Sequence, residues 1–244
     1  MLVHPILAKL ESLRLHGMLV ALTEQMKMPD IDRLGFEERL GLLVDRELTV
    51  RQDRSFKTRL RKAALRQSAC VEDVDFRHPR SLDRSLFMKL ADCRWIKDHQ
   101  NVLIIGPTGV GKTYLGCALA HKACLHGYSA QYVRLPRLLQ DIAIGKGDGR
   151  YAKLLKALGK TDLLVLDDFG LKKLTRDQSD DLLEIVEDRH NLRSTLITSQ
   201  LSVEHWHQVI ADPTLADAIL DRLIHTAHRI ILDGDSMRKK KGLT

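Results

Sequence analysis

The chain has 244 residues, and 44% of them are hydrophobic, which is enough for a sizeable buried core. Lys and Arg outnumber Asp and Glu, and the formal net charge of +7 favours polyanionic partners such as nucleic acid. A basic soluble enzyme without such a partner would have the same balance, so the distribution of charge has to decide. No stretch approaches the ~20 consecutive apolar residues of a membrane-spanning helix, so we expect no membrane association.

Cysteine usage and the N-terminal segment favour a cytoplasmic protein. The four cysteines form neither a C-x-x-C pair nor a disulfide-type framework, so we interpret them as reduced thiols. Residues 1–17 contain no charged segment followed by an apolar run, so no signal peptide is predicted. The cysteines are Cys70, Cys93, Cys117 and Cys124.

Residues 1–68 predict a small all-helical domain. Leucines at positions 7, 10, 13 and 15 form an apolar stripe, and Gly17 is expected to stop or kink that helix. A second helix is predicted from Phe36 to about Leu48, after a connection around Pro29.

A cluster of positive charge follows this helix, with Asp53 as the only acid among seven Lys and Arg residues. A solvated helix face is one interpretation, and phosphate contacts along a DNA backbone are the other. In the second interpretation, the N-terminal domain binds DNA or a protein partner. The candidate DNA-binding residues are Arg51, Arg54, Lys57, Arg59, Arg61, Lys62 and Arg66.

From residue 101 onward, short apolar runs alternate with helical patterns such as those at 113–125 and 177–190. Continuous apolar runs of this length are typical of parallel strands that are buried on both faces. We therefore predict an α/β fold for residues 69–244, with a parallel five-stranded sheet flanked by helices. The predicted strands cover residues 102–105, 130–134, 163–167, 194–199 and 229–232.

A phosphate-binding motif, G-x-x-x-x-G-K-[ST], follows the first of these runs and opens a helical pattern. Its glycines let backbone N–H groups close around phosphate oxygens, and the helix directs its positive end toward the same anion. Lys112 is expected to bind the β- and γ-phosphates of ATP, and Thr113 to offer its hydroxyl to Mg²⁺. The motif comprises Gly106, Pro107, Thr108, Gly109, Val110, Gly111, Lys112 and Thr113.

Two acids, Asp167 and Asp168, follow the apolar run that begins at Leu163. A carboxylate at the end of a parallel strand lies at the carboxyl edge of the sheet, beside the phosphates. We expect Asp167 to hold magnesium, and Asp168 to orient or deprotonate the attacking water. The alternative for Asp168 is an acid at a helix N-terminus that only complements the helix dipole.

With both motifs in place, the chain resembles the AAA+ ATPases, and within them the DnaC-like group of replication and transposition ATPases. It is most similar to the IstB-like helper ATPases of insertion-sequence transposition. The resemblance extends over nearly the whole chain. It implies an ATPase that uses ATP and Mg²⁺, forms a homo-oligomer, and acts with duplex DNA and a transposase. It is carried by FEERL from Phe36, the motif at 106–113, LDD from Leu166, TSQ from Thr198, DAILDRL from Asp217 and SMR from Ser236.

The resemblance also implies roles for residues near the phosphates. The run at 194–199 would lie between the P-loop strand and the Asp167 strand, and Gln200 or Ser199 at its end would sense the γ-phosphate. Arg238 resembles a second sensor that contacts ATP of its own subunit, although it also belongs to a basic tail. Because the chain ends soon after Arg238, we expect the C-terminal lid domain of many AAA+ proteins to be absent.

Arg222 resembles the arginine finger that reaches the ATP of a neighbouring subunit in this superfamily. A guanidinium group in that place would stabilise charge on the transferring phosphoryl group. The alternative is a surface salt bridge with Asp217 or Asp221.

A DnaC-like helicase loader of the same fold is the main alternative function. Single-strand binding uses aromatic stacking, and the aromatic residues of the N-terminal third are only Phe36, Phe56 and Phe76, which favours duplex contact.

A small-molecule kinase is disfavoured because neither an arginine-bearing lid nor an acceptor pocket is identifiable, whereas an ATP-gated binding module that barely hydrolyses ATP stays open. The histidines at 205, 207, 225 and 228 lack a completing ligand, so no metal besides Mg²⁺ is expected.

Overall fold

The computed structural model describes residues 5–237, and the chain divides into two compact units between Thr58 and Arg59. The domain boundary predicted after residue 68 falls within the second unit. Residues directly after Thr58 pack with the second unit, where Arg59 Nε donates to the Cys124 carbonyl oxygen (2.8 Å) and Ala63 is fully buried.

The first unit is helical. The expected stop or kink at Gly17 is wrong, because the chain turns before α2 and Gly17 lies in the first turn of that helix. Its elements are α1 (Pro5–Ser12), α2 (His16–Gln25), a short 3₁₀ turn (Ile31–Arg33) and the greater part of α3 (Phe36–Ala63).

Gly17 is required by the close approach of α2 to α3. A Cβ atom at this position would lie 2.6 Å from the Cα atom of Glu47. The Glu47 carboxylate accepts hydrogen bonds from the backbone N–H groups of Gly17 (2.7 Å) and Met18 (3.2 Å), which have no partner within their own helix. Burial raises the pKa of Glu47, but these bonds and one from Arg51 outweigh burial and lower the pKa below its ordinary value.

Helix α3 is longer than the sequence predicts. It begins at Phe36, as expected, but continues to Ala63 instead of ending near Leu48. Residues 49–63 contain neither Gly nor Pro and are rich in Arg and Lys, which have high helix propensity, so the helix has no reason to end there. All the candidate DNA-binding residues except Arg66 therefore lie on this one helix.

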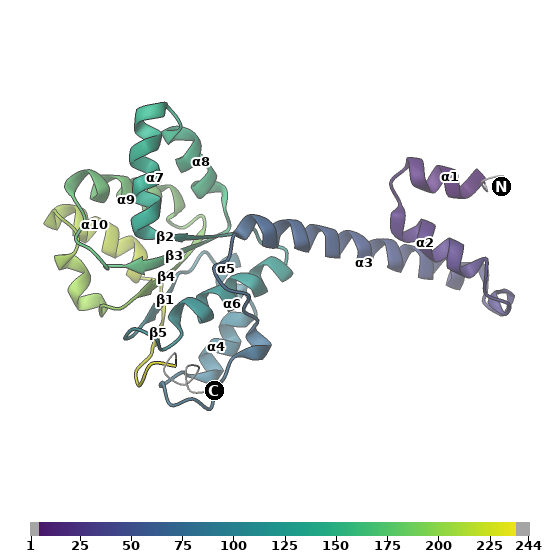
Figure 1. Cartoon of the computed structure of the whole chain (residues 1–244), viewed down its shortest axis with the longest axis horizontal. Coiled ribbons are helices and arrows are strands. Elements are labelled where there is room, and N and C mark those ends of the chain that lie inside the picture. The colour runs from purple at the N-terminus through teal and green to yellow at the C-terminus, as the bar shows by residue number, and fades with distance from the viewer. Residues whose placement is uncertain (1–4, 238–244) are drawn as a thin grey trace. The chain divides into compact units, whose positions relative to one another are not determined.

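The second unit contains a five-stranded parallel sheet in the order β2-β3-β4-β1-β5, which confirms the predicted fold class (Figure 1). The strand at 194–199 does lie between the P-loop strand and the Asp167 strand. The third strand continues past Asp167, and the fifth begins one residue earlier than predicted. The strands are β1 (Val102–Ile105), β2 (Ala130–Arg134), β3 (Leu163–Phe169), β4 (Ser194–Ser199) and β5 (His228–Ile231).

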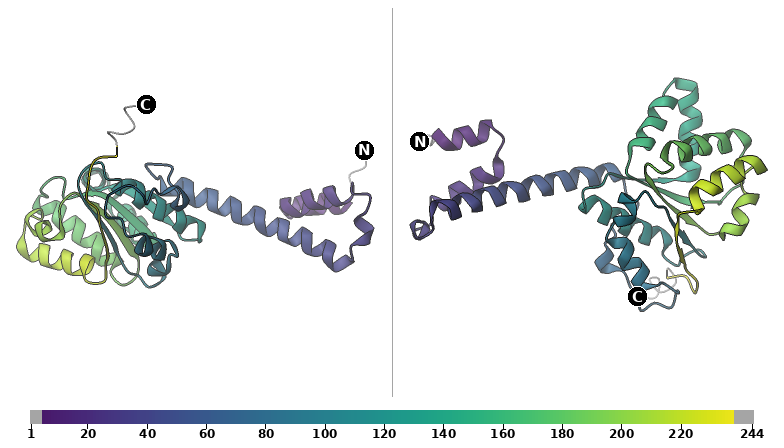
Figure 2. Two further views of the ribbon diagram at one scale, coloured as in Figure 1. Left: turned by 90° about the horizontal axis from the view of Figure 1, so that it is seen from below. Right: turned by 180° about the vertical axis from the view of Figure 1, so that it is seen from behind.

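Helices cover both faces of this sheet, so its strands are buried, as their continuous apolar runs predict. Helix α6, with α4 packed against it, covers one face, and α7 to α10 cover the other (Figure 1 and Figure 2). No helix among residues 5–237 is both long and apolar enough to cross a membrane. The helices are α4 (Arg84–Ala91), α5 (Arg94–Lys97), α6 (Lys112–Leu125), α7 (Leu135–Asp148), α8 (Tyr151–Lys160), α9 (Arg176–Arg189) and α10 (Pro213–Ile224), with 3₁₀ turns at Val71–Asp73 and Val203–Gln208.

An aromatic pair supports the end of β3, where the candidate acids lie. The ring centroids of Phe169 and Trp206 are 4.3 Å apart, and both side chains are buried. Packing of this kind restricts movement of the strand end, so the backbone at Asp167 and Asp168 is held in one position.

Candidate nucleotide-binding site

The P-loop, residues 106–113, connects the end of β1 to the start of α6. Gly109 and Gly111 have φ angles of 92° and 96°, a region that residues with a Cβ atom rarely adopt. Lys112 is the first residue of α6, so the loop ends at the positive end of that helix. The loop therefore has the backbone conformation and the helix start that phosphate binding requires.

The Lys112 ammonium group is held inside the loop. Its Nζ donates to the carbonyl oxygens of Gly106 and Pro107, at 2.7 Å each, and the side chain is buried. Burying a charge is costly unless an opposite charge compensates it. A bound phosphate would supply that charge.

Asp167 is completely buried and surrounded by hydroxyl groups. Thr113 Oγ1 lies 3.0 and 3.2 Å from its two carboxylate oxygens, and the Tyr132 hydroxyl donates to Oδ2 at 2.5 Å. Thr198 donates to Oδ1. These donors come from α6, β2 and β4, so three elements orient one carboxylate beside the P-loop.

The oxygen atoms of Thr113 and Asp167 fit a magnesium ion. Both are hard ligands, which Mg²⁺ prefers. The Thr113 hydroxyl donates a hydrogen bond to Asp167, and its lone pairs stay available to a metal ion. Among residues 5–237, no group of three or more His, Cys, Asp or Glu side chains could hold a metal ion. The chain thus offers two ligands of a site that nucleotide phosphates and water would complete.

Two residues that the sequence analysis did not assign to this site, Tyr132 and Arg66, reach Asp167. Arg66 Nη1 lies 3.8 Å from Asp167 Oδ2, and the same guanidinium group hydrogen-bonds to the Tyr132 hydroxyl. Burial, followed by the hydrogen bond to Asp167, raises the pKa of Tyr132, so this hydroxyl keeps its proton at neutral pH. Arg66 therefore lies beside Asp167, although the sequence analysis placed it among the DNA-binding residues.

Asp168 differs from Asp167 in backbone conformation and in the exposure of its side chain. Its φ is 64°, unusual for a residue with a side chain, and the pairing of β3 with β4 shifts register around it. Its Oδ2 lies 2.7 Å from Arg134 Nε, and its side chain is partly exposed. The alternative role at a helix N-terminus does not fit, because the next helix, α9, begins only at Arg176.

Gln200, rather than Ser199, faces the P-loop. The Thr108 hydroxyl donates to Gln200 Oε1 at 2.7 Å. The Ser199 hydroxyl instead donates to the Phe169 carbonyl oxygen (2.9 Å), and Ser199 is buried. Of the two candidates for sensing the γ-phosphate, the geometry therefore favours Gln200.

A buried arginine supports the P-loop from the segment before α4. Arg80 is 2% exposed, and its guanidinium group donates to the carbonyl oxygens of Val110 and Asp75, at 2.9 Å each, and to the Met237 sulfur atom at 3.2 Å. Burial lowers the pKa of Arg80. A Cβ atom on Gly111 would lie 2.6 Å from Arg80 Nη1, so this glycine is also required by close packing.

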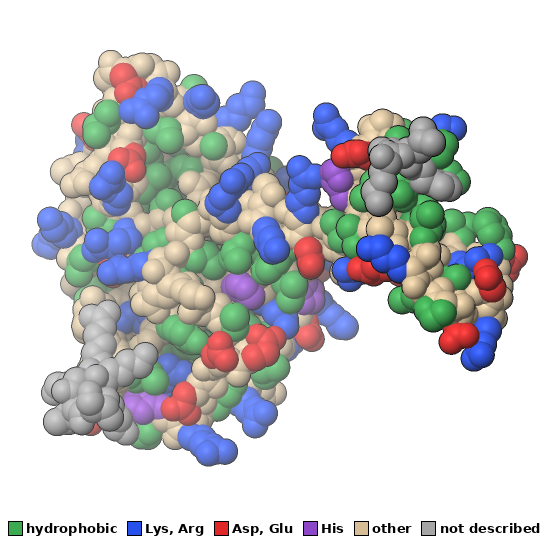
Figure 3. All heavy atoms as spheres, turned by 45° about the vertical axis from the view of Figure 1, so that its right-hand side comes forward, with side chains coloured by type: hydrophobic (Ala, Val, Ile, Leu, Met, Phe, Trp, Pro, Cys, Tyr) green, Lys and Arg blue, Asp and Glu red, His purple; other side chains and the backbone are tan. Residues whose placement is uncertain are grey.

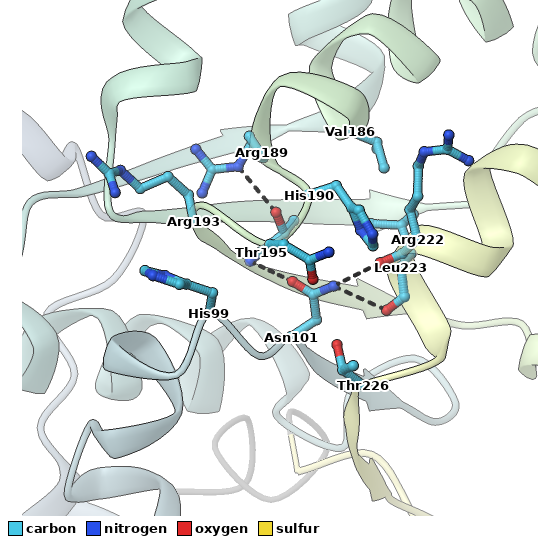
Figure 4. A pocket seen from close by; sticks show the side chains of 11 residues that line it. His99, Asn101, Val186, Arg189, His190, Arg193, Thr195, Arg222, Leu223 and Thr226 are labelled. Atoms are coloured by element: carbon cyan, nitrogen blue, oxygen red, sulfur yellow. Dashed lines mark hydrogen bonds between the residues drawn. The ribbon is translucent and has the colours of Figure 1, made fainter.

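Arg222 lies at the amino edge of the sheet, in a polar pocket (Figure 4). Asn101, just before β1, donates to the carbonyl oxygens of Arg222 (3.1 Å) and Leu223 (3.2 Å). The Arg222 guanidinium group pairs with Glu187 of α9, not with the aspartates of its own helix, and donates to the Ala218 carbonyl oxygen (2.9 Å). The length of β1, about 13 Å, separates Arg222 from the P-loop of its own chain.

The candidate DNA-binding residues fall into two groups. Arg59 and Arg66 bind groups of the second unit, as described above, and Arg51 pairs with Glu47 (2.7 Å) while its side chain stays 61% exposed. Figure 3 shows Lys and Arg side chains spread over one face of the second unit, with fewer Asp and Glu between them. The remaining candidates, all exposed, are Arg54, Lys57, Arg61 and Lys62.

Arg238, the candidate second sensor, lies outside the described residues. The segment that leads to it runs along the P-loop: Met237 N donates to the Gly109 carbonyl oxygen at 3.0 Å. A Cβ atom on Gly109 would lie 2.0 Å from Ser236 Oγ. Residues 232–237 therefore pack directly on the phosphate-binding loop.

The sequence of this chain matches a known protein family. The model of the IstB-like ATP binding protein family matches residues 8–244. This chain belongs to that family. Its IstB-like character thus extends from the first helix to the C-terminal tail, and ATP is the nucleotide that the family name specifies.

Three curated relatives illustrate the similarity of this IstB-like chain to others. A protein of Sinorhizobium fredii, named as insertion sequence ATP-binding protein y4pL, is 52% identical over 99% of this chain and 98% of its own length. A protein of Pseudomonas fluorescens, named for insertion sequence IS1162, is 50% identical over 80% of this chain and 85% of its own. A Mycobacterium tuberculosis protein, named as an insertion-sequence ATP-binding protein, is 34% identical over 95% and 93%.

Solved structures share the fold. A structure of DnaI has a TM-score of 0.59 and 24% identity, and covers 72% of this chain and 93% of its own. A structure of the DnaC helicase loader has a TM-score of 0.55 and 20% identity, with coverages of 65% and 94%. At these identities the likeness concerns the fold alone.

Proposed function

We propose that this protein is an ATPase that assists insertion-sequence transposition. It binds ATP with Mg²⁺, assembles on duplex DNA as a homo-oligomer, and hydrolyses ATP to remodel the DNA and to recruit or activate a transposase. The observation that carries this proposal is the convergence of Thr113 and Asp167 beside the P-loop, in a chain that belongs to the IstB-like family.

The residues divide the chemistry among them. Lys112 and the loop N–H groups bind the phosphates, and Thr113 and Asp167 hold the metal ion, which neutralises phosphate charge when bound. Asp168 orients or deprotonates the attacking water, since its carboxylate is partly exposed at the strand end while that of Asp167 is buried. Gln200, bonded to the loop through Thr108, senses the γ-phosphate.

Arg222 acts in trans, on the nucleotide of a neighbouring subunit. Its position at the amino edge of the sheet supports this role, because it lies at the opposite end of β1 from the P-loop of its own chain. The guanidinium group is only partly exposed and is paired with Glu187, so assembly would exchange this partner for a phosphate.

DNA binding is assigned to the exposed cations of α3, with Arg51 beside them. Arg54, Lys57 and Arg61 follow one another at intervals of three and four residues, which places them along one face of the helix. Contacts of this kind bind the phosphate backbone without reading sequence, so the affinity would fall steeply with salt.

The ATPase rate of the full chain tests this proposal, with and without duplex DNA and over a range of protein concentrations. We expect the rate per subunit to rise with concentration, because the site needs Arg222 from a neighbour, and to rise again with DNA. A rate per subunit that changes neither with protein concentration nor with DNA would contradict the proposal.

A DnaC-like helicase loader is the second candidate, because DnaI and DnaC structures share this fold. The family match favours the first candidate. A pull-down with a replicative helicase in one arm and a transposase of an IstB-containing insertion sequence in the other distinguishes them.

A further inference from the structure

A cation from the segment that follows α3 reaches the metal end of the nucleotide site. Arg66 lies three residues after the end of this helix, and its Nη1 atom is 3.8 Å from Asp167 Oδ2. It also bonds to the Tyr132 hydroxyl, which in turn donates to the same carboxylate oxygen at 2.5 Å. Arg66 thus contacts a carboxylate that lies 101 positions further along the sequence.

The partners of Asp167 differ in how easily they can leave. The hydroxyl groups of Thr113, Tyr132 and Thr198 are fixed to α6, β2 and β4, and they are neutral. Arg66 carries a full charge on a long flexible side chain that is 47% exposed. A guanidinium group at such a place can move into water at little cost, because its head stays hydrated and its stem can remain on the surface.

We propose that Arg66 is the resident counter-cation of Asp167 and that it gives way when this carboxylate takes part in holding magnesium and nucleotide. The inference rests on the proposed function, since it requires a magnesium–nucleotide site at Asp167. Two cations beside one carboxylate repel each other, and Arg66 is the one that is free to move. Filling the site would therefore release the Arg66 side chain from Tyr132 of β2 and Asp167 of β3.

The coupling works in both directions. If magnesium binding displaces Arg66, then an anion that draws Arg66 away must strengthen magnesium binding by the same factor. The neighbouring cations Arg61 and Lys62 are exposed and suited to a phosphate backbone. Arg66 would thus link polyanion binding at the end of α3 to the occupancy of the nucleotide site.

Binding of the fluorescent nucleotide mant-ADP to the full chain, titrated with Mg²⁺, tests this inference without relying on hydrolysis. We expect Arg66→Ala to lower the Mg²⁺ concentration at half-saturation by about three- to tenfold, because a like charge is removed from the site. Arg66→Lys, which keeps the charge, should stay closer to wild type. Arg94→Ala, an exposed arginine of α5 near the amino edge of the sheet, is the matched control and should change nothing.

A second measurement needs no variant. Trypsin cleavage after Arg66, expressed relative to cleavage after Arg94, should rise severalfold when Mg²⁺ is added to the protein with ADP. An unchanged Mg²⁺ dependence in Arg66→Ala, or an unchanged cleavage ratio, overturns the inference. If the wild-type protein still binds mant-ADP in that case, the nucleotide site of the proposed function stands. Wild-type protein that binds no mant-ADP at any Mg²⁺ concentration overturns both.

Discussion

Arg134 Nε lies 2.7 Å from Asp168 Oδ2, so the carboxylate that we assign to the attacking water is paired with the end of β2. The arginine neutralises the negative charge of Asp168 and occupies one of its oxygen atoms. While this pair exists, that oxygen atom is not available to a water molecule. If Asp168 acts on the attacking water as proposed, the ion pair would restrain hydrolysis until another interaction draws Arg134 away.

Arg134→Ala should raise the DNA-independent ATPase rate by about two- to fivefold, which corresponds to the loss of one half-exposed ion pair. Steady-state turnover without DNA measures this effect. Arg137→Ala is the control, because Arg137 pairs with Asp141 on the surface of α7 and should leave the rate unchanged. A fall in the rate of Arg134→Ala would mean that Arg134 holds Asp168 in its working orientation instead.

Lys112→Ala should weaken ATP binding by about 10- to 100-fold, since a charge-assisted hydrogen bond to phosphate contributes about 1.5–3 kcal/mol. Equilibrium titration with mant-ATP in the presence of Mg²⁺ measures this. The control is Lys122→Ala, on the same helix, whose ammonium group pairs with Glu72. Equal mant-ATP affinities of the two variants would show that Lys112 does not bind the phosphates.

Arg222→Ala should leave ATP binding intact but slow hydrolysis by about a thousandfold, the lower range for an arginine finger. Asp168→Asn should also bind ATP without turnover, because an amide accepts no proton from water. Mixing the two inactive variants should restore activity, because some interfaces then combine an intact Asp168 with an intact Arg222. Mixtures as inactive as their components would show that Arg222 does not act across subunits.

Arg80→Met should lower the free energy of unfolding by about 2–4 kcal/mol, because the carbonyl oxygens of Val110 and Asp75 lose a buried donor. Urea unfolding measures this, and mant-ATP affinity should fall with it as the P-loop loses its support. Arg80→Lys should recover only part of both, since one ammonium group cannot span the acceptors of a guanidinium group. Unchanged stability in Arg80→Met would show that the P-loop does not depend on this contact.

The hydrogen bonds to Glu47 predict an acid-sensitive first unit. The folded pKa of Glu47 lies below its ordinary value of about 4.3, so its stabilisation is present above that pH and is lost as the pH falls through the folded pKa. The protection factors of α2 amides, which express exchange relative to the intrinsic rate at each pH, should therefore fall on acidification below about pH 4.5. Glu47→Gln should accelerate exchange already at pH 7 and weaken this pH dependence, whereas the exposed Glu37→Gln should behave like wild type.

Much of the second unit could be predicted because its signals are local. Continuous apolar runs such as 102–105 and 194–199 specify strands buried on both faces, and the glycines of the P-loop specify its backbone. The end of α3 was not predictable in the same way. Its second half has no apolar stripe, and only the absence of Gly and Pro indicates that the helix continues.

The remaining site residues depend on contacts between distant segments. Tyr132 and Arg134 reach the two acids because β2 pairs with β3. This pairing cannot be predicted from the sequence of either strand alone. The available signal for both was their spacing, because Tyr132 and Arg134 are two positions apart and therefore lie on the same face of β2. Arg66 and Arg80 gave no such signal, since a single arginine in a loop is usually solvated.

Asn101 has a consequence for how subunits would influence one another. Its side chain accepts a hydrogen bond from Thr195 N (2.9 Å) and donates two to the end of α10. One end of β1 therefore carries the P-loop, and the other is bonded to the backbone of Arg222, which we propose to act on a neighbouring subunit. A displacement of β1 along its axis would move the P-loop and the backbone of Arg222 together. Under the proposed role of Arg222, the nucleotide state of one protomer would then reach the next through β1 and the hydrogen bonds of Asn101, and the sites would hydrolyse ATP in sequence around the assembly instead of at random.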